Sequence, residues 1–336
     1  MKKEKKINPI VVMILVILVV LLWGGILVFL LQKNGDSDSS QGTEKTPGKQ
    51  VEVNSTLTND DKGKDGQETF VIFGVDSRTD QLGKGTRSDS IMIVHVNHDA
   101  KDVKVASVFR DCMVHIEGYN YEKITHAHSY GGPDLALSTI NENFDLTAAN
   151  YVTVNFNSVS ELVDLLGGIE YTITDEEAGH MGFSGGGTYL LDGDEVVTYS
   201  RIRKAEGGDY KRSERQREML FKIFEKAKTV SKDEQLEMVE IMLDEINTSY
   251  NQDEILEILY YLYQYEIKEM AAFPEVFYAG RVEGAWVEVP VTLVDMNTSL
   301  HKFLFGETEY TPSETVQEYS TTLRNKVSGA NTDLRK

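Results

Sequence analysis

The sequence is short of cysteine and of basic residues, and each shortage excludes a class of protein. Its 336 residues contain one cysteine, Cys112, so no disulfide can form within the chain. Lysine and arginine number 34 against 54 aspartates and glutamates, which gives a net charge of -20. Because proteins that bind nucleic acid through its phosphates need a positive surface, this composition argues against nucleic acid as a partner.

Three sequence signatures of common enzyme sites are also missing. The glycine run at 185–187 is not followed by Gly-Lys-Ser/Thr, so it predicts a surface loop rather than a phosphate-binding loop. No G-x-S-x-G segment marks a serine nucleophile. His126 and His128 lack a third ligand at convincing spacing, which favours core or surface histidines over a zinc site.

A long apolar run lies near the N-terminus. Ile10 to Leu31 is 22 residues without a charge; at 1.5 Å per residue it is about 33 Å long, enough to cross the hydrocarbon core. Lys2, Lys3, Lys5 and Lys6 precede it, which places the N-terminus in the cytoplasm. Because no small-residue cleavage site follows, we expect an uncleaved signal anchor with the rest of the chain outside the cell.

The patterns divide the chain into five segments. They are a cytoplasmic N-terminus at 1–9, a transmembrane anchor at 10–31, a flexible extracellular linker at 32–66, a folded domain at 67–305 and a polar, loosely ordered tail at 306–336. An acidic, disulfide-free, anchored external domain is typical of a bacterial envelope more than of a eukaryotic cell surface.

Strand and helix patterns alternate in the folded domain. Short apolar runs predict strands at 70–75, 90–97, 103–109, 151–156 and 169–173. Helical spacing predicts helices that begin at 133 and at 158, one that ends near 201, one that begins near 212, and two more at 234–246 and 253–265; the segment 271–289 predicts a hairpin. This alternation indicates an α/β sandwich.

Arginines are concentrated in one segment of this acidic chain. They are Arg201, Arg203, Arg212, Arg215 and Arg217, and three more, Arg78, Arg87 and Arg110, lie in earlier segments that also carry aspartates. Arginine presents a planar fork that matches phosphate oxygens two at a time, so the cluster predicts a phosphate-like ligand. For Arg215 and Arg217 the alternative, ordinary salt bridges on a helix face, stays open.

Two aspartates lie at predicted strand ends near these arginines. Asp76 follows the first strand and Asp89 precedes the second. Carboxylate oxygens in such a place suit Mg²⁺, or Mn²⁺, shared with a pyrophosphate. Each aspartate taken singly is equally explained as the cap of a turn, and only the combination with arginines favours the metal.

Six short segments carry a family resemblance. They are G-V-D-S-R (Gly74 to Arg78), R-S-D-S-I-M (Arg87 to Met92), S-V-F-R-D (Ser107 to Asp111), K-I-T-H-A-H-S-Y-G-G (Lys123 to Gly132), Y-S-R-I-R (Tyr199 to Arg203) and G-D-Y-K-R-S-E-R-Q (Gly208 to Gln216). In this order they resemble the successive motifs of the LytR-CpsA-Psr family. The resemblance implies an α-β-α sandwich with a mixed central sheet, preceded by one transmembrane helix.

The resemblance also implies an activity: an envelope phosphotransferase that moves a glycopolymer from a polyprenyl pyrophosphate carrier to peptidoglycan through a phosphodiester. Residues 67–305 would then be its catalytic domain. Together with the arginine pattern it assigns catalytic roles to Arg87, Arg110, Asp111, Arg201 and Arg203, pyrophosphate binding to Arg78, Asp209, Arg212, Arg215 and Gln216, and the metal to Asp76 and Asp89. Phe109, Cys112 and Lys211 depart from the family pattern, which affects loop geometry but removes no charged site residue.

Two other functions stay open at this point. The protein could bind lipid-linked polymer without catalysis, as a sensor, or it could admit water and release the polymer as a hydrolase. Neither the polymer (wall teichoic acid, capsule or another polysaccharide) nor the base, Asp111 or Asp89, is decided. For the lipid tail we expect an apolar groove lined from Ile91, Ile93 and Phe224.

Overall fold

A computed structural model describes residues 66–77, 82–202, 208–227, 229–231, 246–250 and 266–335. The predicted anchor at 10–31, nearly all of the linker at 32–66, and most of the helices predicted at 234–246 and 253–265 lie outside these residues. Within the described ranges, no helix has the length and apolar character needed to cross a membrane.

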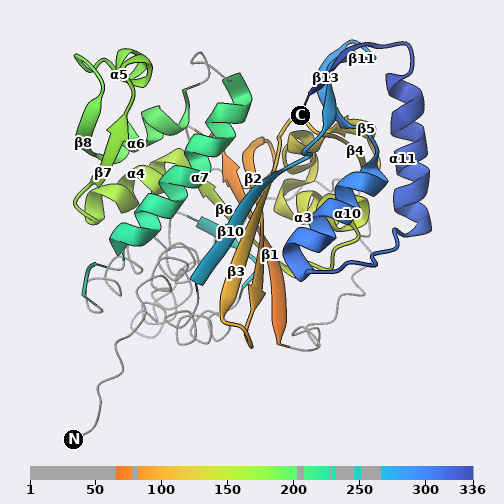
Figure 1. The fold of residues 1–336 in the computed structure, drawn as a ribbon, viewed down its shortest axis with the longest axis horizontal. Helices are drawn as coiled ribbons and strands as arrows, with labels where there is room; N and C mark the ends of the chain where they lie inside the picture. The colour runs from red at the N-terminus through yellow and green to blue at the C-terminus, as the bar shows by residue number, and fades with distance from the viewer. Residues whose placement is uncertain are drawn as a thin grey trace, which may run out of the picture.

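A mixed six-stranded sheet forms the centre of the fold (Figure 1). In spatial order its strands are β10 (Glu266–Phe273), β3 (Asp102–Val108), β2 (Ser88–Asn97), β1 (Gln67–Val75), β6 (Asn150–Asn155) and β9 (Ile246–Thr248). Strands β1, β2 and β3 are antiparallel neighbours, whereas β6 is parallel to β1 and β10 is parallel to β3. The predicted α/β class and the mixed sheet are confirmed, and the strands predicted at 90–97 and 103–109 are the antiparallel neighbours β2 and β3.

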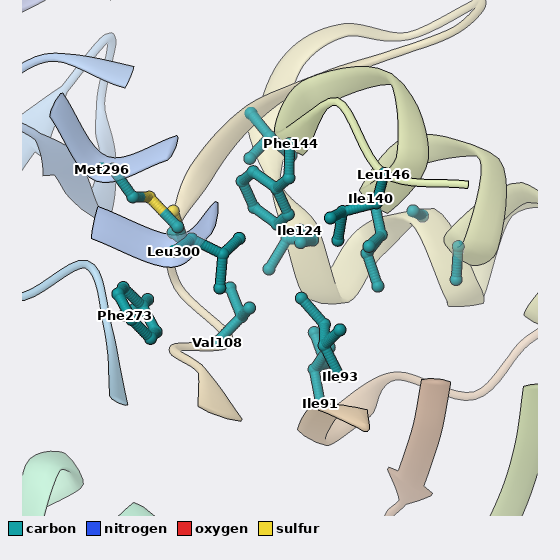
Figure 2. Packing of buried hydrophobic residues seen from close by; sticks show 14 of the residues in the cluster. Ile91, Ile93, Val108, Ile124, Ile140, Phe144, Leu146, Phe273, Met296 and Leu300 are labelled. Carbon is teal, nitrogen blue, oxygen red and sulfur yellow. The ribbon is translucent and has the colours of Figure 1, made fainter. Parts of the chain in front are cut away.

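Two helices, α3 (Ile124–Phe144) and α10 (Leu293–Phe305), cover one face of this sheet. A third helix, α11 (Glu314–Val327), packs on the outer side of these two (Figure 1). Figure 2 shows Ile91, Ile93 and Val108 pointing from the strands towards Phe144 and Leu300 on the helices. Ile91 and Ile93 are 2% and 0% exposed in this packed core, and Ile91 also lines a pocket at the start of β2, so the apolar groove predicted for a lipid tail stays a prediction. The side chain of Phe224 lies outside the described part.

Helix α3 begins earlier than predicted. The sequence indicated a helix start at Pro133, but a first helical segment already begins at Ile124 and meets the second at Gly132. Gly132 has φ 76° and ψ -165°, a conformation that only glycine adopts without strain. Pro133 then opens the second segment, where its missing N–H costs no hydrogen bond. The first segment carries its apolar residues, Ile124 and Ala127, into the core.

A second group of elements packs beside the sheet, on the left in Figure 1. It comprises α4 (Phe156–Leu165), β7 (Ile169–Ile173), α5 (Asp175–Met181), β8 (Gly187–Leu191), α6 (Gly193–Ser200) and α7 (Gly208–Ala227). Capping boxes at Asn155, Thr174 and Asp192 start α4, α5 and α6. Val163, Val196 and other apolar residues of these helices form their own core.

The glycine run at 185–187 lies at the start of β8, as expected of a surface turn and not of a phosphate loop. The Gly186 N–H donates to Asp175 Oδ1 at 2.7 Å. A Cβ atom at Gly186 would lie 2.7 Å from the Asp175 nitrogen, so the close approach of these two segments requires glycine.

The C-terminal region is more ordered than predicted. A small antiparallel sheet joins β12 (Ala285–Pro290), β11 (Phe277–Val282) and β13 (Asn331–Arg335) in that order, which confirms the hairpin predicted within 271–289. Residues 306–336 are not a loosely ordered tail, because they include α11 and β13. Val316 and Leu323 of α11 are 0% and 1% exposed in the main core.

Candidate active site

Four segments that are far apart in the sequence meet at one pocket. The start of β2, the end of β3, helix α7 and strand β12 surround a small, partly open pocket. The charged and amide side chains of its lining are Asp89, Arg110, Asp111, Arg212, Gln216 and Glu288. The structure therefore brings five of the predicted site residues together and adds Glu288.

Arg110 is fixed by carboxylates at the bottom of this pocket. Its Nη1 donates to Asp89 Oδ1 at 2.7 Å, and its Nε lies 3.7 Å from Asp111 Oδ2. Asp111 is held in turn by Lys123, whose Nζ is 2.8 Å from Asp111 Oδ1. Because the Arg110 side chain is 20% exposed, this network places a guanidinium at the pocket surface in a defined orientation.

Backbone contacts hold the Arg110 segment in place. The N–H of Thr125, in the first turn of α3, donates to the Arg110 carbonyl at 3.2 Å. The N–H of Glu288 donates to the Asp111 carbonyl at 2.9 Å, which ties β12 to the same segment. Lys123 lies in the hairpin of β4 (Met113–Ile116) and β5 (Asn120–Lys123), just before α3. The position of Arg110, just after β3, is thus set by helix α3, strand β12 and the β4–β5 hairpin.

Helix α7 supplies the opposite wall. Arg212 and Gln216 are four residues apart, so they lie on one face of the helix, and both line the pocket. Arg212 is only 4% exposed although it is charged. Met219 and Ile223, further along α7, are buried in the neighbouring core and anchor the helix.

A second pair of predicted residues lies at the end of β1. Arg201 Nη2 is 3.2 Å from Asp76 Oδ2, and its guanidinium lies over the Phe156 ring with 4.7 Å to the centroid. In the pairing of β1 with β2, Val75 is opposite Ser88, so Asp76 and Asp89 lie at the same end of this strand pair. Both side chains of the Asp76–Arg201 pair are more than a third exposed.

Arg215 has a different place from the one predicted. Its Nε donates to Glu177 Oε1 at 2.8 Å, its Nη1 donates to the Ile202 carbonyl at 3.3 Å, and its guanidinium lies 5.8 Å from the Tyr199 ring centroid. Only 6% of its side chain is exposed. Arg215 is therefore a structural residue that joins α7 to α5 and to the end of α6, and the salt-bridge alternative holds for it.

The remaining predicted residues are placed less fully. Arg87 is exposed, one residue before β2. Arg78 and Arg203 lie outside the described residues, as does the side chain of Asp209, which belongs to the first turn of α7. The predicted roles of these four residues stay predictions.

The two histidines of the K-I-T-H-A-H segment contact neighbouring protein groups. His128 is buried, and its Nδ1 lies 2.9 Å from the Thr86 carbonyl; His126 Nδ1 lies 2.9 Å from Glu122 Oε2. Burial lowers the pKa of His128 below its usual value, which keeps its ring neutral. In the described part of the chain, no three acidic, histidine or cysteine side chains are arranged to hold a metal ion.

Two residues of the site escaped the sequence analysis. Lys123 was noted only as part of a motif, and its contact with Asp111 spans 12 residues that include a hairpin. Glu288, which is 5% exposed, comes from a strand whose sequence carries no site pattern. A glutamate between Val287 and Val289 in a buried strand was the one available signal, because a buried carboxylate needs a polar partner.

Comparisons with known proteins agree with this arrangement. The model of the LytR_cpsA_psr family matches residues 27–291. The polyisoprenyl-teichoic acid–peptidoglycan teichoic acid transferase TagT of Bacillus subtilis is 35% identical over 182 residues, which cover 51% of this chain and 56% of TagT. The TagU protein of Oceanobacillus iheyensis is 29% identical over 253 residues, covering 70% of this chain and 75% of TagU.

A solved structure extends the similarity to the fold. The structure described as TagT bound to LIIa-WTA has a TM-score of 0.58 and 25% identity, and covers 81% of this chain and 94% of that one. The sequence alignments are shorter, and the chain spans about half the length of the first curated relatives it matches. Because the family model matches residues 27–291, most of the sequence, the chain belongs to the LytR_cpsA_psr family.

Proposed function

We propose that the protein is a membrane-anchored phosphotransferase that moves a glycopolymer from a polyprenyl pyrophosphate carrier to peptidoglycan. The observation that carries this proposal is the single pocket that Arg110 and Arg212 both line, at the start of β2 and the end of β3. The names of the relatives describe polyisoprenyl-linked teichoic acid as donor and peptidoglycan as acceptor. They support the same substrate classes for this chain.

The reaction exchanges one P–O bond for another. A hydroxyl oxygen of the acceptor attacks the phosphorus that carries the polymer, and the bond from that phosphorus to the bridging pyrophosphate oxygen breaks. Polyprenyl phosphate leaves with the bonding electrons, and the hydroxyl proton passes to a base. Negative charge therefore grows on the leaving phosphate, and fixed cations around it lower the barrier.

Arg110 and Arg212 supply these cations from opposite walls of the pocket. Arg110 is held by Asp89 and Asp111 before any ligand binds, so little reorganisation is needed when charge develops. Both oxygens of Asp111 face cations, Lys123 and Arg110, which makes Asp111 a positioning carboxylate in this proposal. Arg201, held by Asp76 and Phe156, is an exposed third cation for the polymer-side phosphate.

Asp76 and Asp89 fit a hard divalent cation, Mg²⁺ or Mn²⁺, by their chemistry and position. Their carboxylates lie at the same end of β1 and β2, and a carboxylate can accept from arginine and still offer an oxygen to a metal. With only two protein ligands, the ion would take its other oxygens from pyrophosphate and water. When bound, it would neutralise charge on the pyrophosphate.

The proposed location follows from the sequence. The apolar run at 10–31 is the signal anchor, its N-terminal side is cytoplasmic, and the domain acts outside the cell membrane near its lipid-linked donor. The names of the relatives favour teichoic acid as the polymer over the other candidates, capsule polysaccharide or another secondary polysaccharide.

The test uses the full chain in lipid vesicles with a polyprenyl pyrophosphate-linked saccharide, Mg²⁺ and peptidoglycan fragments, and mass spectrometry of the products. We expect a phosphodiester adduct that falls about 100-fold or more in Arg110→Gln, as for loss of a charge-stabilising donor. Arg324→Gln, an exposed arginine on α11, is the control and keeps full activity.

Other products would point to the other functions. Released polymer without an adduct would make the protein a hydrolase. Donor binding without either product would make it a binder of lipid-linked polymer, and the proposed transfer would be wrong.

A further inference from the structure

We infer that Trp286 forms a sugar-binding subsite beside the pocket, and that its occupant is the glycan of the peptidoglycan acceptor. The inference rests on the proposed function, which makes peptidoglycan the acceptor. It starts from strand β12, because this strand contributes Glu288 to the pocket lining and Trp286 to the surface.

The strand register places Trp286 and Glu288 on one face. Trp286 is opposite Arg281 and Glu288 is opposite Ala279, in a pairing of β11 and β12 without a bulge. Alternate residues of a strand share a face, and two residues span about 7 Å. Cys112 forms a parallel bridge with Glu288, so this strand lies directly against the Arg110–Asp111 segment. Trp286 therefore extends the wall of the pocket outward.

The Trp286 side chain is available to a ligand. It is 50% exposed, whereas Glu288 on the same face is 5% exposed. Within the described part of the chain, its indole has no hydrogen bond and no ring contact. Its place on the strand that lines the pocket, and the amphipathic character of the indole, are what make it a candidate contact for a ligand.

A sugar fits this surface better than a lipid or a peptide does. The apolar face of an indole packs against the C–H face of a pyranose, while its N–H and neighbouring charged groups reach the hydroxyls at the ring edge. Arg281 lies opposite Trp286 and is exposed, and its Nη1 donates to the Gly284 carbonyl at 2.9 Å. The surface thus combines one flat apolar group with polar neighbours.

The charge of this face favours the acceptor over the donor polymer. Glu288 and Asp333 are balanced by Arg281 and Arg335, and Arg335 Nη2 lies 3.7 Å from Asp333 Oδ2. A face with equal numbers of acidic and basic groups does not attract a polymer of repeated phosphates. It suits the uncharged sugar rings of a glycan strand.

The sequence allows a direct test by fluorescence. Trp23 and Trp286 are the two tryptophans of the chain, so Trp23→Phe leaves Trp286 as the single tryptophan of the full-length protein, and excitation at the red edge of the tryptophan band avoids its tyrosines. Chitotetraose, a neutral oligomer of N-acetylglucosamine, is the probe for the glycan, and soluble poly(glycerol phosphate) is the probe for a donor polymer. We expect a saturable emission change with chitotetraose and none with the phosphate polymer.

A transfer assay adds a second readout. Trp286→Ala should raise the KM for peptidoglycan fragments about tenfold, the loss of one aromatic contact, and leave the KM for the lipid-linked donor unchanged. Leu334→Ala is the matched control, because Leu334 is 52% exposed on the same small sheet but pairs with Tyr278 and so lies on the opposite face. It should change neither constant.

The outcomes separate this inference from the proposed function. No emission change with chitotetraose, a response to poly(glycerol phosphate) alone, or an unchanged acceptor KM in Trp286→Ala would overturn the subsite. A sugar response at Trp286 in a protein that forms no adduct with any acceptor would support the subsite while the proposed transfer fails.

Discussion

Among the ion pairs in the described part of the chain, the pair of Glu177 and Arg215 is well buried on both sides and should contribute strongly to stability. The Glu177 side chain is 12% exposed and that of Arg215 is 6% exposed, with 2.8 Å between Oε1 and Nε. Removing one partner of a buried pair leaves the other charge without compensation, which costs about 3–5 kcal/mol. Glu177→Ala should therefore lower the free energy of unfolding by about that amount in urea denaturation of the full chain.

The contribution of this ion pair to folding stability should depend on pH. Burial acts to raise the pKa of Glu177, but hydrogen bonds from Thr174 and Arg215 more than offset it, so the pKa is lowered in the folded protein. The stabilisation is therefore complete above the unfolded pKa of about 4.3 and is lost as the pH falls through the lower folded pKa. The difference in stability between the parent and Glu177→Gln should shrink over that acidic range.

A control and a functional readout make this test decisive. Glu170→Ala removes an exposed glutamate from β7 in the same group of elements, and should change stability by less than about 0.5 kcal/mol. Because Arg215 also holds the Ile202 carbonyl, Glu177→Ala should weaken donor binding through the Arg201 segment. If Glu177→Ala unfolds at the same urea concentration as Glu170→Ala, the structural role of Arg215 is refuted.

Three further predictions concern a histidine, the C-terminal helix and the metal. Burial, together with Lys104, lowers the pKa of His95 to about 4. The neutral ring therefore stabilises the fold above pH 6.5, and that stabilisation is lost as the pH falls towards 4. An NMR titration of His95 checks the pKa. Leu323→Ala should cost about 2–5 kcal/mol in denaturation experiments, whereas a loosely ordered tail would tolerate it. Chelation of divalent cations should abolish transfer in the parent and Mg²⁺ should restore it; full activity in EDTA would contradict the roles proposed for Asp76 and Asp89.

The site shows where prediction from sequence succeeds and where it fails. Asp89, Arg110, Asp111, Arg212 and Gln216 were all predicted, and all line one pocket. Arg215 was grouped with them because residue type and spacing cannot distinguish an arginine that faces a pocket from one that faces a buried glutamate. That distinction depends on Glu177, which is 38 residues away in a different helix.

The same limit applies to the fold. Short apolar runs predicted the strands from residue 70 to 173, because a strand buried in a sheet forms a continuous apolar stretch. They did not indicate that Ile91 and Ile93 of β2 both lie in the main core, which depends on the helices packed against that strand. The C-terminal segment looked polar because α11 buries only a narrow stripe, Val316, Ser320 and Leu323.

The sequence by itself determined the family, the α/β class with several of its strands and helices, and the residues able to bind an anion, since these depend on residue type and local spacing. Only the tertiary structure decided which charges meet. Lys123 reaches Asp111 because the β4–β5 hairpin folds back between them. Glu288 joins the pocket, with Trp286 two residues before it, because β12 packs against the Arg110–Asp111 segment; Asp111 and Trp286 are 175 residues apart in the chain. Contacts across such separations depend on how the two sheets are packed, and no local pattern in the sequence records that packing.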